Sequence, residues 1–273
     1  MALHFDHVVH FVKDPSAIPK ALQEYGLLAV EGGSHINLGT FNALCYFGLS
    51  YIEFLGAYDK EMVRAGDHLP YSLHESVIQQ QFAEGFVRFA LRTDSIHEDA
   101  AAFRKAGLIV NGPVSMSRKR TDGSLLKWQL LFLGDGSGLD LPFIIQWNEK
   151  DAVREQDLKD KGLLQHPSEA DFSHLSIAAA NGEQTAKAWA GYFGGKLGSS
   201  YRDEKLQSDC YPLAFEGGNL VFCTPYEEKG AVAELLEEHG EKPFEITLLT
   251  NRESQTVQLH GGSYTFKKRD EKK

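Results

Sequence analysis

Three histidines near the start of the chain are the first residues whose types and spacing suggest chemistry. His4, His7 and His10 lie three residues apart, a spacing that would gather them on one helix face as a metal-binding cluster. However, residues 4–12 are rich in Val and Phe and stop at Asp14-Pro15, which favours a strand. Because side chains alternate along a strand, His7 faces away from His4 and His10. The three histidines therefore cannot share one metal ion.

Glu53 is the second residue whose type suggests chemistry, and it lies in the run Ser50-Tyr51-Ile52-Glu53-Phe54-Leu55. Alternation places Phe5 and His7 on one face of the first strand, and Tyr51 and Glu53 on one face of this later strand. If the two strands are neighbours, an imidazole and a carboxylate meet. Asp6 and Asp14 are interpreted as turn and cap residues.

The elements that would position these side chains follow the order βαβββ. Hydrophobic patterns and turn residues predict the first unit. It comprises a strand at 4–12, a helix from Asp14-Pro15-Ser16 to Tyr25, a strand at 27–31, a turn at Gly32-Gly33, and a hairpin of 38–47 with 50–58.

The same order recurs along the chain, which indicates repeated supersecondary units. A helical connector at 73–82 leads to a strand at 85–93, a helix at 95–106 capped by Ser95, strands at 114–120 and 125–133 around Asp122-Gly123, and a strand at 141–147. After a polar linker at 148–170 comes a third copy. It starts at Asp171-Phe172-Ser173-His174-Leu175 and continues with a helix at 184–192, a hairpin from 211 to 224 and a helix at 231–239. Strands at 244–250 and 263–267 form a truncated fourth copy.

Composition limits the class of protein. The length of 273 residues allows one large or two ordinary domains. A formal charge of −10, from 38 acidic and 28 basic residues, argues against a nucleic-acid or anionic-membrane partner. Neither a signal peptide nor an apolar run of about 20 residues is predicted. The scattered cysteines Cys45, Cys210 and Cys223 are interpreted as buried thiols in a reducing cytoplasm.

Several motifs in the first half of the chain carry a family resemblance. They are Gly32-Gly33-Ser34-His35, the run from Gly39 to Leu44, Tyr51-Ile52-Glu53-Phe54, Arg118, Asp122-Gly123, Trp128, and the run from Pro142 to Trp147. With the βαβββ repeat, they resemble the glyoxalase-like domain proteins of the vicinal oxygen chelate superfamily. That superfamily includes glyoxalase I, extradiol dioxygenases and bleomycin-resistance proteins. The resemblance implies an α+β fold in which βαβββ modules pair into cup-shaped mixed sheets. It also implies a glyoxalase-like domain of two modules at 1–150 and a degenerate domain at 165–273.

The resemblance further implies a metal site on the floor of the first cup. In the superfamily, the first and last strands of each module supply the ligands, and His7 and Glu53 match these positions. Alternatively, Glu53 would be the catalytic base beside the metal. Such a ligand pair suits Zn, Mn, Fe or Ni. Two alternatives remain open for the pair: a buried His–Glu hydrogen bond, or a ligand site without metal.

The later modules depart from this ligand pattern. In the second, Val87 and Ile145 occupy the ligand positions, and only a bulge could turn Gln146 inward. In the third, His174 matches His7, but Val221 replaces the carboxylate. The resemblance nevertheless predicts a pocket around the pair, lined by His35, Thr40, Asn42, Tyr51, Arg118, Trp128 and Gln146. For Trp128 and Trp147, a position in the core is favoured over a role as a stacking platform.

Two functions follow from these observations. The first is a metal-dependent lyase, isomerase or dioxygenase of a small vicinal-oxygen compound, with no organic cofactor. Gln146 or His35 would complete its metal ligands. The second is a non-catalytic protein that binds or sequesters a small molecule, as bleomycin-resistance relatives do. The missing second-module ligands favour the latter. Exposed edge strands would also allow a homodimer.

Overall fold

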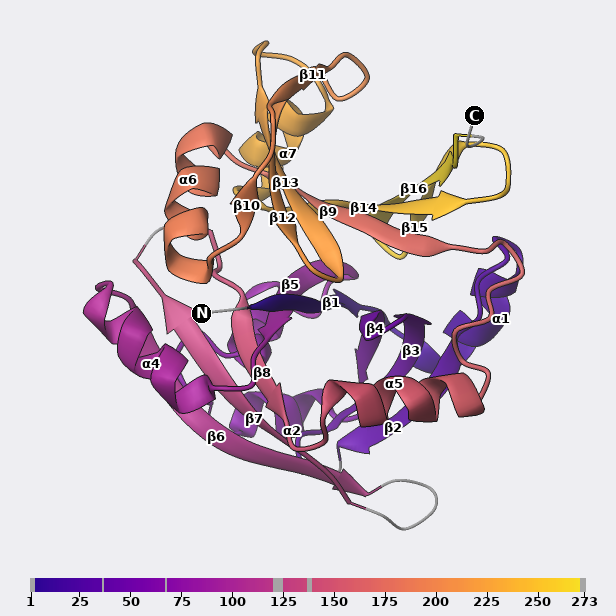
Figure 1. Cartoon of the computed structure of the whole chain (residues 1–273), viewed down its shortest axis with the longest axis vertical. Coiled ribbons are helices and arrows are strands. Elements are labelled where there is room, and N and C mark those ends of the chain that lie inside the picture. The colour runs from indigo at the N-terminus through magenta and orange to yellow at the C-terminus, as the bar shows by residue number, and fades with distance from the viewer. Residues whose placement is uncertain (1–2, 36, 67, 120–124, 137–138, 271–273) are drawn as a thin grey trace.

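The computed structural model of the chain describes residues 3–35, 37–66, 68–119, 125–136 and 139–270. Its strands form two curled mixed sheets, the first from residues 4–147 and the second from residues 171–268. Figure 1 shows the first sheet curling into a cup, with the second sheet above it. The predicted α+β fold of cup-shaped mixed sheets is confirmed.

The first sheet joins two βαβββ modules through its two central strands. Its strand order is β2-β3-β4-β1-β5-β8-β7-β6. The pair β1–β4 is parallel, and so is β5–β8, whereas β1 and β5 are antiparallel where the modules meet. The bounds are β1 His4–Phe11, β2 Val30–His35, β3 Thr40–Phe47, β4 Ser50–Ala57, β5 Gly85–Arg92, β6 Ile109–Lys119, β7 Leu125–Gly134 and β8 Phe143–Trp147.

The second sheet repeats the module once and then shortens it. Its strand order is β10-β12-β13-β9-β14-β16-β15, with β11 paired to β12. The chain passes from β14 to the β15–β16 hairpin without an intervening helix, and β15 is an element that the sequence patterns missed. The bounds are β9 Asp171–Ala178, β10 Lys196–Leu197, β11 Tyr201–Asp203, β12 Ser208–Phe215, β13 Gly218–Pro225, β14 Lys242–Thr250, β15 Gln255–Leu259 and β16 Gly262–Lys268.

Short helices connect the strands. They are η1 Pro15–Ala17, α1 Ile18–Gln23, α2 Lys60–Ala65, α3 Leu73–Gln79, α4 Ile96–Lys105, α5 Asp151–Asp160, α6 Gly182–Phe193 and α7 Ala231–His239. Asp14 caps η1 by accepting a hydrogen bond from the Ser16 N–H, as predicted. In the described part of the chain, no helix has the length and apolar character that crossing a membrane requires.

Four local predictions from the sequence need correction. The Gly32-Gly33 pair lies inside β2 rather than in a turn, because β2 pairs with β3 through a bulge that absorbs the glycines. The predicted polar linker contains α5, and the connector between modules contains α2 in addition to α3. Ser95 is at the N-cap of α4, but its side chain makes no capping bond. The expected turn at Asp122-Gly123 lies outside the described residues.

Strand β1 is buried on both faces because each face packs against a different core. A bulge between Phe5 and His7 shifts its register against β5. Strict alternation predicted that Phe5 and His7 share one face. The bulge makes this prediction wrong, because it turns Phe5 to the other face. Its ring instead stacks on Phe172 of the second sheet, with centroids 4.8 Å apart. The fully buried Asp6 lies in a strand, so its interpretation as a turn residue is wrong.

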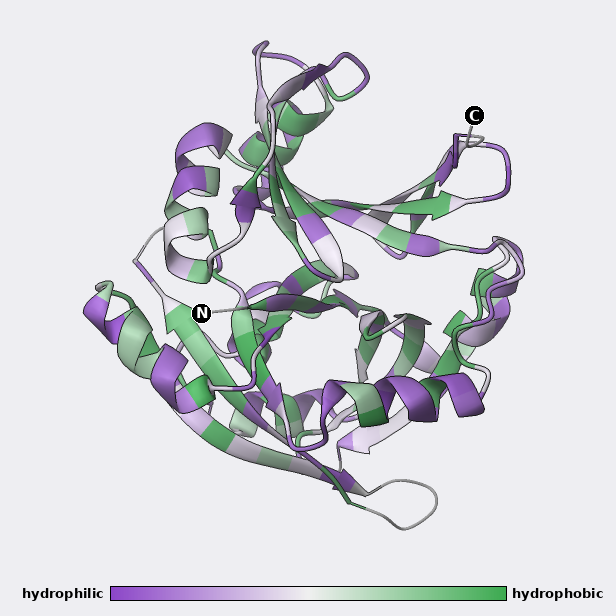
Figure 2. Cartoon of the chain, in the orientation of Figure 1, coloured by the Kyte–Doolittle hydropathy of each residue, from purple (hydrophilic) through white to green (hydrophobic). Residues whose placement is uncertain are grey.

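The main hydrophobic core lies between the two sheets, where their convex sides face each other. It includes Phe89 of β5 and Trp189 of α6, with ring centroids 5.9 Å apart. The C-terminal ends of α4 and α6 meet at this junction, where Phe103 lies edge-on to Phe193 with ring centroids 5.7 Å apart. Figure 2 shows hydrophobic residues concentrated on the central strands and hydrophilic residues on the outer turns of α5. Two smaller apolar clusters lie on the concave sides.

A buried histidine connects the sheets at this junction. His10 Nδ1 lies 2.6 Å from the Tyr264 hydroxyl, and His10 Nε2 lies 2.8 Å from the carbonyl oxygen of His260. A carbonyl can only accept, so Nε2 carries the proton and Nδ1 accepts from Tyr264. This neutral tautomer satisfies both ring nitrogens. Burial lowers the pKa of His10 from 6.5 to about 4.

We expect His10 to make folding sensitive to acid. In the unfolded chain a histidine takes a proton near pH 6.5, whereas folded His10 does so only near pH 4. Above pH 6.5 the residue has no effect. As the pH falls toward 4, it should lower the free energy of unfolding by about 3 kcal/mol in total. The comparison variant is His10→Gln, whose amide can serve the same two partners without titrating.

Urea unfolding of both proteins at about pH 7.5 and about pH 5 measures this effect. The stability difference between wild type and His10→Gln should change by about 2 kcal/mol in favour of the variant at the lower pH. Other buried histidines titrate in both proteins and cancel. A difference that stays constant over this range would show that His10 is not the responsible group.

Candidate functional site

The concave side of the first sheet encloses a cavity of about 590 Å³. This volume falls within the range of roughly 300–1,000 Å³ that small-molecule sites occupy. Strands β2, β3, β4, β6, β7 and β8 form its walls, β1 lies at its floor, and residues of α3 and α5 complete the lining. The predicted site residues that line it are His7, His35, Thr40, Asn42, Tyr51, Glu53, Arg118 and Trp128.

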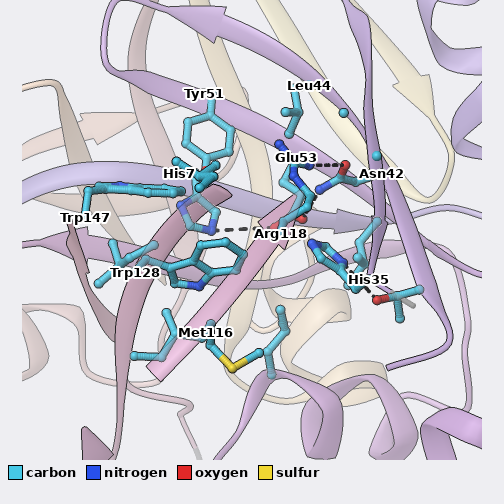
Figure 3. A pocket seen from close by; sticks show the side chains of 18 of the residues that line it. His7, His35, Asn42, Leu44, Tyr51, Glu53, Met116, Arg118, Trp128 and Trp147 are labelled. Carbon is cyan, nitrogen blue, oxygen red and sulfur yellow. Dashed lines mark hydrogen bonds and ion pairs between the residues drawn. The ribbon is translucent and has the colours of Figure 1, made fainter. Parts of the chain in front are cut away.

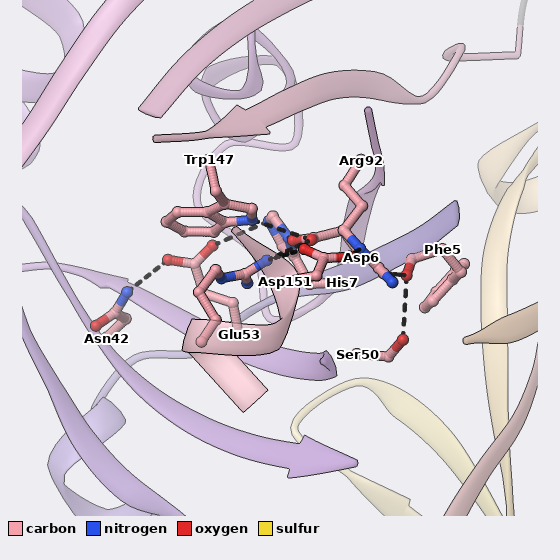
Figure 4. Close-up of polar contacts among 10 residues, drawn as sticks. Phe5, Asp6, His7, Asn42, Ser50, Glu53, Arg92, Trp147 and Asp151 are labelled. Carbon is pink, nitrogen blue, oxygen red and sulfur yellow. Dashed lines mark hydrogen bonds and ion pairs between the residues drawn. The ribbon is translucent and has the colours of Figure 1, made fainter. Parts of the chain in front are cut away.

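An Asp–His pair stands at the centre of the floor (Figure 4). Asp6 Oδ1 lies 2.7 Å from His7 Nδ1, and Asp6 Oδ2 accepts a hydrogen bond from Trp147 Nε1 at 3.1 Å. Arg154 Nη1 lies 3.9 Å from the same Oδ2. Burial alone would raise the pKa of Asp6. The hydrogen bond from His7 and the charges of Arg154 and Arg92 outweigh it and hold that pKa below its usual value.

The ionised Asp6 determines which nitrogen of His7 carries a proton. A carboxylate only accepts hydrogen bonds, so His7 Nδ1 is the donor, and Nε2 is the nitrogen without a proton whenever the ring is neutral. The imidazole stacks on Tyr51, with ring centroids 4.5 Å apart, and meets the edge of Phe143 at 5.3 Å. These contacts fix the ring, so Nε2 points into the cavity as a base of defined orientation.

Glu53 lies next to that nitrogen without bonding to it. Glu53 Oε2 is 3.7 Å from His7 Nε2, which is longer than a hydrogen bond. Its other oxygen, Oε1, accepts from Asn42 Nδ2 at 2.6 Å. Asn42 Oδ1 accepts in turn from Arg118 Nη1 at 3.4 Å. Figure 3 shows Glu53, Asn42 and Arg118 gathered on one side of His7. Both the Nε2 lone pair and Glu53 Oε2 are therefore available to a ligand.

The glycine pair of β2 makes room for this arrangement. A side chain at Gly32 would collide with the Asn42 amide oxygen. A Cβ at Gly33, whose φ is +142°, would lie 3.4 Å from Cδ of Arg118. Arg118 belongs to β6, so the sheet curls until the side chain of one edge strand reaches the other edge. The Gly-Gly motif thus permits close approach, which is a different role from the predicted turn.

Histidines surround the rim of the cavity. His35 Nδ1 lies 3.0 Å from Thr40 Oγ1, and burial is the main cause of its lowered pKa. His68 and His74 stack in parallel with ring centroids 4.8 Å apart. Burial, followed by the neighbouring His68 and His35, lowers the pKa of His74 to about 4. His68 and His74 were missed in the sequence because they lie between modules, in no recognisable motif.

The structure corrects the prediction that Gln146 is a pocket residue. On β8 the cavity is lined by Phe143, Ile145 and Trp147, and Gln146 does not line it. Its Oε1 accepts a hydrogen bond from the Ile96 N–H at 2.8 Å, at the start of α4. The strand keeps its alternation here, so no bulge turns the amide inward. Trp147, for which the sequence favoured a core position, takes the inward position.

The segment interpreted as a linker contains a further cavity residue that the sequence analysis missed. Helix α5 places Arg154 over the Trp147 ring, with its guanidinium carbon 4.3 Å from the centroid. Arg154 Nη1 also lies 3.3 Å from Asp151 Oδ1, one helical turn earlier. Arg154 thus lines the cavity and reaches Asp6 at the same time. The one sequence feature that could have indicated a role for Arg154 is its i, i+3 spacing from the oppositely charged Asp151. Such pairs are common on exposed helices.

The donor groups do not fit the predicted divalent metal. His7 and Glu53 are the right types, and a carboxylate on Nδ1 is usual behind a metal-binding histidine. However, Ile145 and Phe143 line the cavity from the other module, and one oxygen of Glu53 is engaged by Asn42. Across the described ranges, no three His, Cys, Asp or Glu side chains are grouped so as to hold an ion. Catalytic zinc typically has about three protein ligands.

Comparison with known families identifies the first part of the chain. The family model described as "Glyoxalase-like domain" matches residues 5–193. This range includes the whole first cup and the start of the second sheet. No curated protein matches the sequence.

Solved structures with the same fold show how far the likeness extends. A hypothetical protein from Staphylococcus aureus has a TM-score of 0.80 at 20% identity, covering 98% of this chain and 100% of its own. A mutant of 4-hydroxymandelate synthase from Streptomyces coelicolor has a TM-score of 0.59 at 12% identity, covering 92% of this chain and 72% of its own. At these identities the likeness shows a shared fold.

Proposed function

The chain belongs to the glyoxalase-like domain family of the vicinal oxygen chelate superfamily, and from this premise we propose that its first cup is an enzyme site. The reaction class is proton transfer at a carbon next to a carbonyl group, as in a lyase or isomerase acting on a small oxygenated molecule. The observation that carries this proposal is the Asp6–His7 pair, whose free Nε2 faces Glu53 inside the cavity.

Each polar residue of the floor has a role in this reaction. His7 Nε2 accepts the proton from carbon, and the ionised Asp6 stabilises the imidazolium that forms. Glu53, held through Asn42, exchanges a proton at the neighbouring atom of the substrate. The Arg118 guanidinium, which shares Asn42 with Glu53, offsets negative charge that develops on the carbonyl oxygen. Positioned acid–base groups of this kind contribute about 10²- to 10⁴-fold to a rate.

The metal-dependent form of this activity stays a prediction from the family resemblance. His7 and Glu53 would hold the ion, with Zn, Mn, Fe or Ni as candidates. It requires further ligands that the described residues do not supply, so the mechanism above assigns no step to a metal. The alternative of a non-catalytic binding protein is supported by the largely apolar lining of the cavity.

One experiment separates the three possibilities. Pyruvate, 2-oxobutyrate and phenylpyruvate are incubated with the protein in D2O, and NMR follows the exchange of the protons next to the carbonyl. We expect exchange above the uncatalysed rate, unchanged after the protein has been treated with a chelator. Loss of exchange on chelation and recovery with added Zn²⁺ or Mn²⁺ would establish the metal-dependent form. Binding of these compounds without exchange would favour the sequestering function.

Other expectations from the sequence also stay predictions. These are the cytoplasmic location, the homodimer, and the division into domains at 1–150 and 165–273. The second domain is proposed to be structural, because Val221 stands at the position of Glu53. The register supports this comparison: His174 pairs with Asn219 two residues before Val221, as His7 pairs with Tyr51 two residues before Glu53.

A further inference from the structure

The two modules contribute different chemistry to the wall of the cavity. The polar floor groups His7, Asn42 and Glu53, with His35 at the rim, come from the first module. The strands of the second module contribute a mainly apolar surface, and Arg118 is the charged residue among their described lining residues. The apolar residues of that surface are Val114, Met116, Leu126, Trp128, Leu130, Phe132, Phe143, Ile145 and Trp147.

The strand register arranges these apolar side chains in two parallel rows across β6, β7 and β8. Met116 pairs with Trp128, and Trp128 pairs with Trp147. In the adjacent row, Val114 pairs with Leu130, which pairs with Ile145. All six residues line the cavity. We call this surface, made of the two rows, the apolar wall. Its second row includes Ile145, which stands where the family resemblance expects a metal ligand.

The two indole rings give the apolar wall an aromatic surface, in which the Trp147 ring is fixed. Trp128 and Trp147 have ring centroids 5.6 Å apart and planes tilted by 46°. Trp147 cannot turn freely, because its Nε1 donates to Asp6 and Arg154 covers its ring. Trp128 is only partly buried although it lines the cavity. In Figure 3 the Trp147 ring lies on the side of His7 away from Asn42, and the Trp128 ring lies below His7, between it and Met116.

We propose, building on the proposed function, that the substrate is a compound with an aromatic body and a small oxygenated head. The head, an oxo or hydroxy acid group, lies against His7, Glu53 and Arg118. The ring lies on the apolar wall beside Trp128 and Met116. A volume of about 590 Å³ accommodates a ring with its side chain and exceeds what a three-carbon compound would fill. Placing the ring there removes apolar surface from water on both partners.

Two probes with the same head test this inference by calorimetry. Phenyllactate and lactate are both 2-hydroxy acids and differ only in the ring. We expect phenyllactate to bind about 10- to 100-fold more tightly, from burial of the ring. Trp128→Leu should reduce this ratio by at least about threefold, because it removes the aromatic surface. The matched control is Tyr201→Leu, which removes an exposed aromatic residue of the second sheet and should leave the ratio unchanged.

Further outcomes keep this inference separate from the proposed function. If Trp128→Leu does not fold, Met116→Lys should reduce the ratio instead, since it places a charge on the apolar wall. His7→Gln should preserve the ratio, because binding of the probe's ring to the apolar wall does not depend on the base.

Equal affinity for the two probes, or no binding of either, overturns the inference. If phenyllactate is preferred but no proton exchange occurs, the proposed function fails alone. If pyruvate exchanges as fast as phenylpyruvate, the inference on the ring fails alone.

Discussion

Replacing His7 with Gln is expected to lower the protein-catalysed rate of proton exchange in phenylpyruvate by about 10²- to 10⁴-fold. The reason is that Nε2 of His7 is the unprotonated nitrogen that faces the cavity, with its ring fixed by Tyr51 and by Asp6. Gln can still donate a hydrogen bond to Asp6, so the buried carboxylate keeps a partner. NMR in D2O measures the rate, and calorimetry with phenyllactate verifies that the cavity still binds.

Variants of the two neighbouring carboxylates make this expectation specific. Asp6→Asn removes the charge that stabilises the imidazolium, so it should lower the exchange rate as well. Glu53→Gln keeps the Asn42 contact within reach but cannot exchange a proton, and should also slow the reaction. A His7→Gln protein that exchanges protons within about threefold of the wild-type rate would remove His7 from the mechanism.

Replacing Arg88 with Ala is expected to lower the free energy of unfolding by about 3–5 kcal/mol. Arg88 on β5 is 1% exposed, and its Nη1 and Nη2 donate to the carbonyl oxygens of Tyr71 and Leu141. Truncation leaves both carbonyls without this donor and opens a cavity where a large side chain was. Urea denaturation followed by circular dichroism measures the loss.

Two control substitutions show which part of Arg88 matters. Arg88→Met restores much of the volume without the donors, so it should cost less than Arg88→Ala but remain clearly destabilising. Arg104→Ala changes an exposed arginine of α4 and should cost within about 0.5 kcal/mol. Equal stability of Arg88→Ala and Arg104→Ala would contradict a structural role for the buried guanidinium.

The position of Arg88 also connects stability to the site. Tyr71, which accepts its hydrogen bond, adopts a positive φ of 62° just before α3. Leu73 and His74 of α3 line the cavity. Loss of Arg88 should therefore loosen this wall, and the surviving folded protein is expected to bind phenyllactate more weakly than wild type.

Much of the first module was predictable because it depends on local rules. Alternation along a strand placed Tyr51 with Glu53 on one face and separated His7 from His4 and His10. The hairpin around Gly48 brought Asn42 opposite Leu55, two residues from Glu53, with both side chains directed into the cup. These relations follow from the alternation of side chains along a strand, which repeats every two residues, and from the residue types in turns. Both can be read from the local sequence.

Other parts of the site depend on contacts between distant segments. Asp6 reaches His7 because β1 bulges where it pairs with β5, and a bulge depends on the partner strand. Arg154 reaches Asp6 because α5 packs across the cup, although its sequence is mostly polar. Gln146 is the opposite case: β8 keeps the alternation that local rules predict, and the amide turns outward to accept from the Ile96 N–H.

The composition and patterning of this chain thus predict the repeated βαβββ order and the family resemblance, and that resemblance predicts the pairing of His7 with Glu53. Folding in three dimensions adds the ionised Asp6 behind His7 and the apolar wall opposite Glu53. It also places helix α5 across the cup. The physical reason is that alternation and turns act over a few residues. The protonation state of a buried group and the polarity of a cavity arise from residues that meet only when distant strands pack.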